Sequence, residues 1–331
     1  STEANPHRYL LSGRTALDHI IQDIKQSTKF KSVYMPSYCC QSMIQPFIDS
    51  NIEVKFYRVR FEENRFVYDV DYEINCDAIL IMQYFGFNND SEKVIIDEFV
   101  SRGKVVIEDA THSWFSESPY SSNADYVLAS FRKWTGVPCG AIIVKPKSQF
   151  LIGISIQTNS PYIDLRTKAA ILKKEYITNQ SGNKEGFLNL FTQAEHLLDK
   201  DYKSYIVTVD LEDKLKKLYT DKIKQIRRDN AAYLIKELKT IVGITTIKVT
   251  ENDTPLFVPI MIDKDIRDKL QQYLKVKDIY CPIHWPLTSD HRIKDISLYE
   301  NCLSIVCDQR YTLADMHRII EQIRDFMVNG K

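Results

Sequence analysis

The sequence has no excess of charge of either sign and no long apolar run. Lysine plus arginine and aspartate plus glutamate each number 44 among 331 residues, so no net positive charge indicates a nucleic-acid or membrane-surface partner. No apolar run approaches the roughly 18 residues of a membrane-spanning helix, and the first residues lack the basic and apolar regions of a secretory signal. We expect a soluble cytoplasmic protein that binds neither nucleic acid nor membrane.

The cysteines include no pair spaced for metal or redox chemistry. Seven are scattered along the chain, and the only close set is the adjacent pair Cys39 and Cys40. Because no Cys-x-x-Cys motif occurs, we predict no metal site. An odd number of scattered cysteines is most simply explained if the protein works in a reducing compartment, where cysteines stay unpaired.

The first half of the chain alternates helix-like and strand-like segments. A continuous apolar run at 77–82 (DAILIM) is typical of a strand buried in a parallel sheet. Strands separated by helix-length crossovers indicate an α/β protein with a mostly parallel sheet. Strands are expected at 32–35, 53–57, 77–82, 104–107, 126–129 and 141–144, and helices at 15–24, 38–49 and 91–101.

The second half has a different pattern. Residues 161–241 are helical and strongly charged, especially 211–238, where we interpret the charges as a solvated helix face. Residues 178–185 are expected to form an exposed, mobile loop. Strands return at 245–249, 256–262 and 303–306, with helices at 264–274 and 312–327. We divide the chain into a large α/β domain, residues 1–205, and a linking helix with a small α+β domain, residues 206–331.

A first candidate segment, Glu108–His112 (EDATH), follows the strand expected at 104–107. Ligands of open α/β sheets collect at the carboxyl ends of the strands. An acid in this place can bind a metal, act as a general base or pair with a cationic ring nitrogen. It can also do no more than cap the next helix.

A second segment, Ser130–Gly136 (SFRKWTG), follows the strand expected at 126–129. The amine of Lys133 can form a Schiff base with an aldehyde if its surroundings lower its pKa, and the Ser130 hydroxyl can bind a phosphate. A single loop lysine is usually a surface residue. Its position one crossover after the strand-end Asp109 favours a site.

A third segment, Ser12-Gly13-Arg14-Thr15, precedes the first helix. Free backbone N–H groups at a helix N-terminus form a natural phosphate cradle. The alternative is a plain N-cap without a ligand.

Taken in order, these segments resemble the DegT/StrS-type sugar aminotransferases, a branch of the aspartate-aminotransferase fold type. SGRTAL (12–17) resembles the opening element of that family, VVIEDATHSW (105–114) its acidic segment, and ASFRKWTGVPCGAIIV (129–144) its lysine loop. Further similar stretches follow in the same order: residues 33–57, 78–87 (AILIMQYFGF), 226–234 (IRRDNAAYL), 281–286 (CPIHWP) and 308–320.

The resemblance implies a fold type I enzyme that uses pyridoxal 5'-phosphate (PLP). Lys133 would hold the cofactor covalently and move protons in the reaction, and Asp109 would pair with the ring nitrogen. His112 would lie near the ring and its phenolic oxygen. Either Tyr84 or Phe85 would stack on the ring.

The resemblance also implies how the cofactor phosphate and the substrate are bound. Ser130, with the backbone of Gly13 and Arg14, would bind the phosphate. His284 and Trp285 would line the substrate entrance, although His284 can equally be a packed or solvated loop histidine.

Some features depart from the family pattern. Arg14 stands where threonine is commonest, and two residues separate Ser130 from Lys133 where three or more are usual. Residues 145–200, a region that often shapes the sugar site, match poorly.

The activity implied is amination of a keto nucleotide-sugar for polysaccharide or natural-product synthesis, with glutamate or glutamine as donor, by a homodimer. One alternative is another PLP reaction on this scaffold, such as that of a lyase, decarboxylase or acyl-transferring synthase. The other is a catalytically silent binding regulator, which Arg14 and the short lysine loop suggest.

Overall fold

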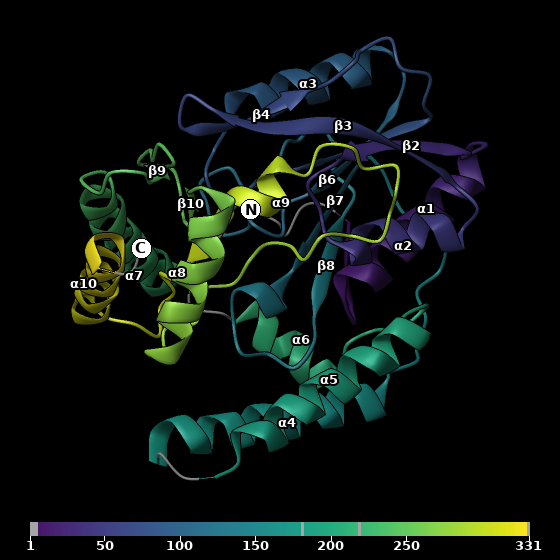
Figure 1. The fold of residues 1–331 in the computed structure, drawn as a ribbon. Helices are drawn as coiled ribbons and strands as arrows, with labels where there is room; N and C mark the ends of the chain where they lie inside the picture. Colours follow the sequence, from purple (N-terminus) through teal and green to yellow (C-terminus); the bar gives the residue numbers. More distant parts are fainter. Residues whose placement is uncertain (1–5, 180–181, 218–219, 330–331) are drawn as a thin grey trace.

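The computed structural model describes residues 6–179, 182–217 and 220–329, and it contains a large and a small sheet (Figure 1). The large sheet has, in spatial order, β1 (His7–Leu10), β8 (Ala141–Val144), β7 (Tyr126–Ser130), β6 (Val105–Asp109), β5 (Ala78–Met82), β2 (Ser32–Pro36), β3 (Glu53–Glu62) and β4 (Arg65–Asp69). The strands from β7 to β3 are parallel, and the pairs β7–β8, β8–β1 and β3–β4 are antiparallel. The predicted α/β class with a mostly parallel sheet is confirmed.

The central strands are buried because helices cover the sheet. Every residue of β2, β5, β7 and β8 is buried, as their apolar runs predict. Helix α1 (Gly13–Ser27) packs on β7, β8 and α2 (Gln41–Asp49), and α3 (Asp90–Ser101) packs on β5 and β6. The β2-α2-β3 and β5-α3-β6 crossovers run in opposite directions along the sheet, so the right-handed crossover rule places α2 and α3 on opposite faces.

One edge of the large sheet was only partly predicted. Strand β3 extends five residues beyond the expected end at residue 57 and turns back into β4. Glu63 and Asn64 form the turn with φ of 48° and 63°, the backbone shape that suits a tight hairpin. Strand β1 at the opposite edge was also missed.

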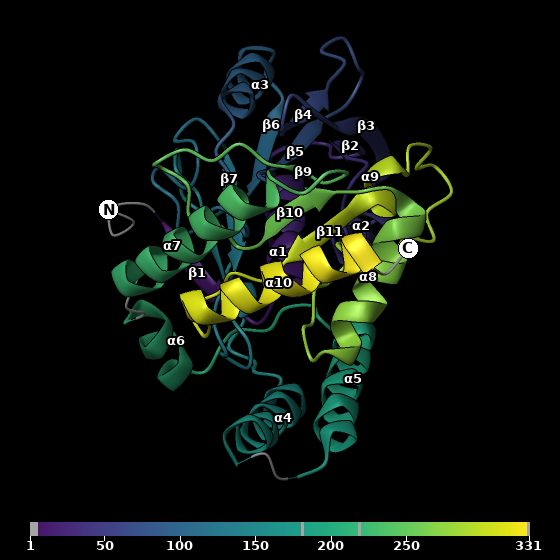
Figure 2. The same cartoon turned by 60° about the vertical axis from the view of Figure 1, so that its left-hand side comes forward.

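The small sheet is antiparallel and contains β11 (Cys302–Ile305), β10 (Val258–Met261) and β9 (Thr245–Thr246). Helices α7 (Thr220–Leu238), α8 (Lys264–Val276) and α10 (Leu313–Asn329) surround it, and α9 (Ser297–Asn301) precedes β11 (Figures 1 and 2). The strands and helices expected after residue 242 are present. The boundary between residues 205 and 206 stays a prediction.

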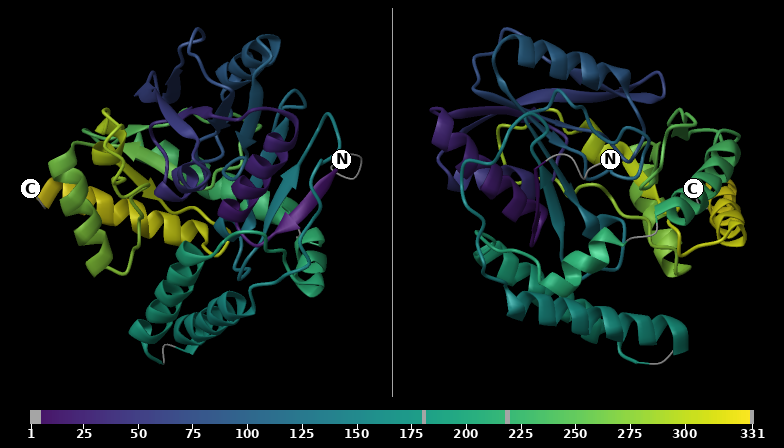
Figure 3. Two further views of the ribbon diagram at one scale, coloured as in Figure 1. Left: turned by 90° about the vertical axis from the view of Figure 1, so that its right-hand side faces the viewer. Right: turned by 180° about the vertical axis from the view of Figure 1, so that it is seen from behind.

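Two further helices, α4 (Ser160–Asn179) and α5 (Lys184–Lys200), form a hairpin that projects from the body of the molecule in every view (Figures 1, 2 and 3). The short helix α6 (Val209–Lys216) follows it. Residues 180–181 of the expected loop and 218–219 of the charged stretch lie outside the described residues. Among the described helices, none combines the length and the apolar character needed to cross a membrane.

Arg227 of α7 connects the small sheet to the segment that follows β7. Its side chain is 2% exposed. The guanidinium donates hydrogen bonds to the carbonyl oxygens of Pro255 at 3.1 Å, Leu256 at 2.9 Å and Trp134 at 3.5 Å, and to Oε1 of Gln309 at 2.8 Å.

Candidate active site

The segments that follow β5, β6 and β7 meet at one edge of the large sheet, and two of them are the predicted strand-end segments. Met82 at the end of β5 is in register with Asp109 at the end of β6, and Asp109 is in register with Leu128 of β7. The segments after these strands carry the aromatic pair Tyr84-Phe85, His112 and Lys133. Because the strands are parallel and adjacent, side chains far apart in sequence come together here.

Lys133 ends a short 3-10 turn, η2 (Phe131–Lys133), directly after β7. Solvent reaches its side chain, yet the protein that surrounds the amine removes part of the bulk water and lowers the pKa of Lys133. The amine interacts electrostatically with Asp109, His112 and His284. A lowered pKa provides the free amine that attack on an aldehyde requires.

The lysine turn is anchored by Trp134, which sequence reasoning did not select. The indole is 2% exposed, and its N–H donates a hydrogen bond to the carbonyl oxygen of Thr111 at 2.5 Å. Thr111 Oγ1 in turn accepts a hydrogen bond from the backbone N–H of Ser130 at 3.1 Å. These two hydrogen bonds therefore hold the segment after β6 and the segment after β7 in place against each other.

Asp109 is 5% exposed at the end of β6. Its Oδ1 accepts a hydrogen bond from the backbone N–H of Thr111 at 2.9 Å. Burial raises the pKa of Asp109, while the hydrogen bonds from Thr111 and the positive charge of Lys133 act in the opposite direction. A nearby cationic group would therefore favour the ionised carboxylate.

His112 is buried and neutral. Burial, with His284 and Lys133 nearby, holds its pKa well below the usual range. Its Nδ1 accepts a hydrogen bond from the backbone N–H of Phe85 at 3.2 Å, so the proton of the neutral ring is on Nε2. The ring stacks on Phe85, with centroids 5.3 Å apart and planes 29° apart.

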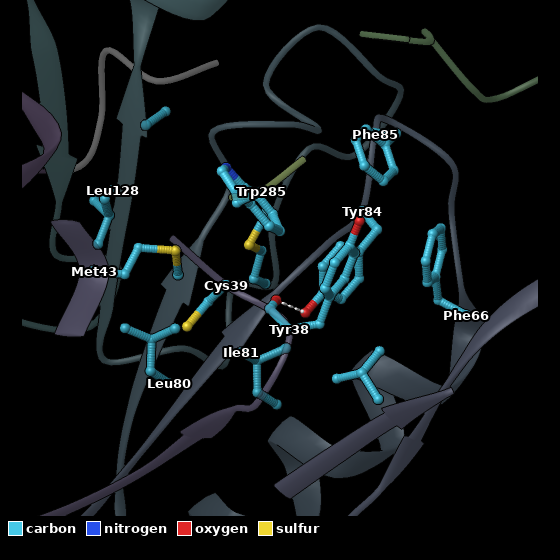
Figure 4. Close-up of a cluster of buried hydrophobic side chains, with 14 of the residues drawn as sticks. Tyr38, Cys39, Met43, Phe66, Leu80, Ile81, Tyr84, Phe85, Leu128 and Trp285 are labelled. Carbon is cyan, nitrogen blue, oxygen red and sulfur yellow. Dashed lines mark hydrogen bonds between the residues drawn. The ribbon is translucent and has the colours of Figure 1, made fainter. Parts of the chain in front are cut away.

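The structure distinguishes the two aromatic candidates. Tyr84 stacks on Phe66 at 4.7 Å, and its hydroxyl donates to the Tyr38 carbonyl at 2.5 Å, so it belongs to the core (Figure 4). Phe85 lies against His112 and has φ of +60°, a backbone state that non-glycine residues adopt rarely and often at functional sites. At Gly86 a Cβ would collide with the Thr254 carbonyl, so this turn requires glycine.

The first turn of α1 is both an N-cap and a potential cradle. Ser12 accepts hydrogen bonds from the backbone N–H groups of Thr15, at 3.2 Å, and Ala16, at 2.9 Å. The N–H groups of Gly13 and Arg14 have no acceptor within the helix. A Cβ on Gly13 would lie 3.8 Å from Cβ of Ser130, so the helix start adjoins the end of β7. The Arg14 guanidinium pairs with Asp199 and with Glu195, both on α5.

His284 and Trp285 reach this edge from the segment before β11. Nδ1 of His284 and Oγ of Ser304 are 2.8 Å apart, and the His284 carbonyl accepts a hydrogen bond from Tyr38. Burial and the charge of Lys133 lower the pKa of His284 to about 3. Trp285 stacks on His112, with centroids 5.8 Å apart, and is 7% exposed. All the predicted site residues lie in this region, although the Tyr84 side chain packs in the core and the Arg14 guanidinium pairs with acids of α5.

Comparisons with known proteins identify the fold. No protein-family model and no curated protein matches the sequence. A DegT DnrJ EryC1 StrS aminotransferase from Brucella abortus has a TM-score of 0.63 and 15% identity, over 98% of this chain and 87% of that one.

Two further solved structures were obtained with ligands. NtdA of Bacillus subtilis, with bound cofactor PMP, has a TM-score of 0.67 and 12% identity, over 98% of this chain and 74% of that one. DesI, in the presence of its TDP-sugar product, has a TM-score of 0.64 and 13% identity, over 98% and 81%. The chain therefore has the fold of the DegT/DnrJ/EryC1/StrS aminotransferases, as the sequence motifs predicted.

Proposed function

We propose that this chain is a PLP-dependent aminotransferase in which Lys133 holds the cofactor. The observation that supports this most directly is the position of the Lys133 amine, beside Asp109, His112 and His284 at the carboxyl edge of the large sheet. The fold is that of enzymes with this activity, and one of them was solved with PMP.

The residues present fit the cofactor. The free N–H groups at the start of α1 suit a phosphate, and the absence of a side chain at Gly13 leaves space beside Ser130. Asp109, at the end of the adjacent strand, supplies a carboxylate within electrostatic range of Lys133. The phosphate would meet the start of α1 and Ser130, the ring nitrogen would meet Asp109, and the aldehyde would meet Lys133.

When bound, PLP supplies an aldehyde that condenses with amines and an electron-poor ring. Asp109 would accept a hydrogen bond from the protonated ring nitrogen. The free amine of Lys133 would take a proton from the substrate carbon and return it to another position. His112 would present its Nε2–H toward the ring because Nδ1 is occupied by the Phe85 N–H. Trp285 would help to exclude water.

For the substrate we propose a keto nucleotide-sugar, with glutamate or glutamine as amino donor. The DesI structure with its TDP-sugar product supports a substrate of this class. Arg132, Arg166 and Arg14 lie close to the lysine turn and outnumber the two acids that pair with them, Glu195 and Asp199. The remaining positive charge suits an anionic substrate. We also propose that two copies of the chain form the active enzyme.

Reaction with PLP tests the role of Lys133. We expect purified protein to develop an absorbance band with PLP, and borohydride to fix the cofactor to the peptide that contains Lys133. Lys133→Ala should lose both signals and all turnover, because among the described residues Lys133 is the lysine that acts on Asp109, His112 and His284. Lys147→Ala, which changes an exposed lysine paired with Asp125, is the matched control.

The same preparation distinguishes the possible reactions. Formation of PMP from bound PLP on addition of glutamate supports transamination. A trapped adduct at Lys133 without PMP formation from any amino donor would indicate another PLP reaction. The absence of any adduct at Lys133 would refute the proposed function.

A further inference from the structure

Three arginines from three elements converge on one carboxylate beside the lysine turn. Glu195 of α5 accepts hydrogen bonds from Arg132 at 2.7 Å and from Arg166 of α4 at 3.2 Å. Its other oxygen is 3.7 Å from the guanidinium of Arg14 at the start of α1. Glu195 therefore connects the α4–α5 hairpin to two segments of the candidate site.

Arg132 and Arg166 hold the lysine turn on both sides. Arg132 is the residue immediately before Lys133, and its guanidinium also donates to the Tyr162 hydroxyl at 2.7 Å. Arg166 donates from Nε to the carbonyl oxygen of Pro138, five residues after Lys133, at 3.3 Å. Both guanidinium groups are largely enclosed, with side chains 15% and 17% exposed.

Glu195 is the carboxylate that these two arginines share. Asp199 pairs with Arg14, and within the described residues neither Arg132 nor Arg166 has another acidic partner at ion-pair distance. Partly buried cations are costly when they lack a counter-charge. Without Glu195, the two enclosed positive charges next to Lys133 would have no counter-charge in the described part of the chain.

We propose that Glu195 is a positioning residue for Lys133, which fixes the lysine turn through Arg132 and Arg166 and balances their charge beside the amine. The inference rests on the proposed function for its catalytic meaning, although the arrangement can be tested without cofactor. This role adds helix α5 to the site, although α5 lies within residues 145–200, which match the family pattern poorly.

The groups around the Lys133 amine come from several elements. The protein around the amine removes part of the bulk water and so lowers the pKa of Lys133. The charges of Arg132 and Arg166 lower this pKa further, whereas Glu195 and Cys40, which precedes α2, raise it.

Three further groups face the amine. Asp109 adds negative charge, and His112 and His284 are neutral. Removing the charge of Glu195 should therefore lower the pKa of Lys133 further.

The test measures the pKa of Lys133 in the full chain without cofactor. The rate of acetylation of Lys133 by trace acetic anhydride, read by peptide mass spectrometry, follows the fraction of free amine as pH is varied. In Glu195→Gln we expect the midpoint to move to lower pH by roughly half a unit to one unit, the effect of a single charge at a solvent-accessible group. Glu195→Asp, which keeps the charge, should restore the wild-type midpoint.

Two further variants keep the result interpretable. Glu185→Gln makes the same change at an exposed position of α5 and should not move the midpoint. Arg166→Gln removes a cation and should move it to higher pH, which provides a measurement if Glu195→Gln does not fold. An unchanged midpoint in folded Glu195→Gln, or an unchanged or lower one in Arg166→Gln, would overturn the proposal. Because this assay contains no PLP, its outcome is independent of the trapping experiment that tests the proposed function.

Discussion

At the scale of single residues, burial determines the charge state of the candidate catalytic groups. Asp109 is buried deeply enough for its pKa to rise, and Lys133 and the Thr111 hydrogen bonds oppose that rise. His112 and His284 are held neutral by the same desolvation. Neither histidine is therefore available as a cationic acid beside the lysine at neutral pH.

Asp109→Asn should impair catalysis while the fold remains intact. The amide has the same shape but cannot offer a full negative charge to a ring nitrogen. We expect kcat/KM to fall by about 10- to 100-fold or more, the rate equivalent of a charged hydrogen bond. Steady-state kinetics measure this, and Glu98→Gln on the exposed side of α3 is the control. Wild-type kinetics in Asp109→Asn would contradict the role of Asp109.

Sequence motifs could identify residues that act at strand ends, but not those that support them from a distance. Asp109 and Lys133 stood directly after recognisable strands. Glu195 lies in a charged helix where nothing marks one acid among many. The choice between Tyr84 and Phe85 also needed coordinates, because a turn with φ of +60° at Phe85 decides which ring faces His112.

At the scale of elements, β6 ends in two acids whose side chains serve different purposes. Successive residues of a strand point to opposite faces, so Glu108 lies on the other face from Asp109. Glu108 is 1% exposed, and its Oε2 accepts a hydrogen bond from the Ser121 N–H at 2.8 Å. Burial raises the pKa of Glu108 to about 8.

This shift predicts a pH dependence of stability. A carboxyl with a pKa of 4.5 when unfolded and about 8 when folded holds its proton more tightly in the folded chain. The stabilisation that this carboxyl gives to the folded chain is therefore fully present below pH 4.5, its pKa in the unfolded chain, and is lost as the pH rises through about 8, its pKa in the folded chain. Glu108→Gln cannot ionise, so its free energy of unfolding should fall less across this range, by on the order of 1 kcal/mol or more. Urea unfolding at several pH values measures the difference, and parallel curves for both proteins would rule the effect out.

The elements that could be predicted from sequence are those with long apolar runs. Strand β5 and its neighbours were identified because both of their faces are covered, whereas β1 and β4 at the sheet edges are short and partly exposed. Beyond Tyr57 the charged residues of β3 alternate with the apolar Val59 and Phe61, a pattern of period two that the short window at 53–57 did not include. Edge strands carry a weaker hydrophobic signal, and so they were missed.

At the scale of the whole molecule, the projecting α4–α5 hairpin supports the proposed homodimer. Ile171 and Ile177 of α4 and Leu188 of α5 are 53%, 60% and 47% exposed in the single chain. Apolar residues on a projecting element are typical of an interface. Sedimentation velocity should show a dimer, and Ile177→Glu should weaken it. A fully active monomer would contradict this prediction.

The buried guanidinium of Arg227 has a consequence for how the protein denatures. It contacts the polypeptide on both sides of the junction between the large and small sheets, through Trp134 and through Pro255 and Leu256. Pulling the sheets apart would break the hydrogen bond of the guanidinium to the Trp134 carbonyl oxygen and its contact with the Trp134 ring, and would expose surface that is buried on both sides of the junction. Heating should therefore melt both sheets in a single cooperative step, and Lys133 should lose its surroundings only when the whole chain unfolds.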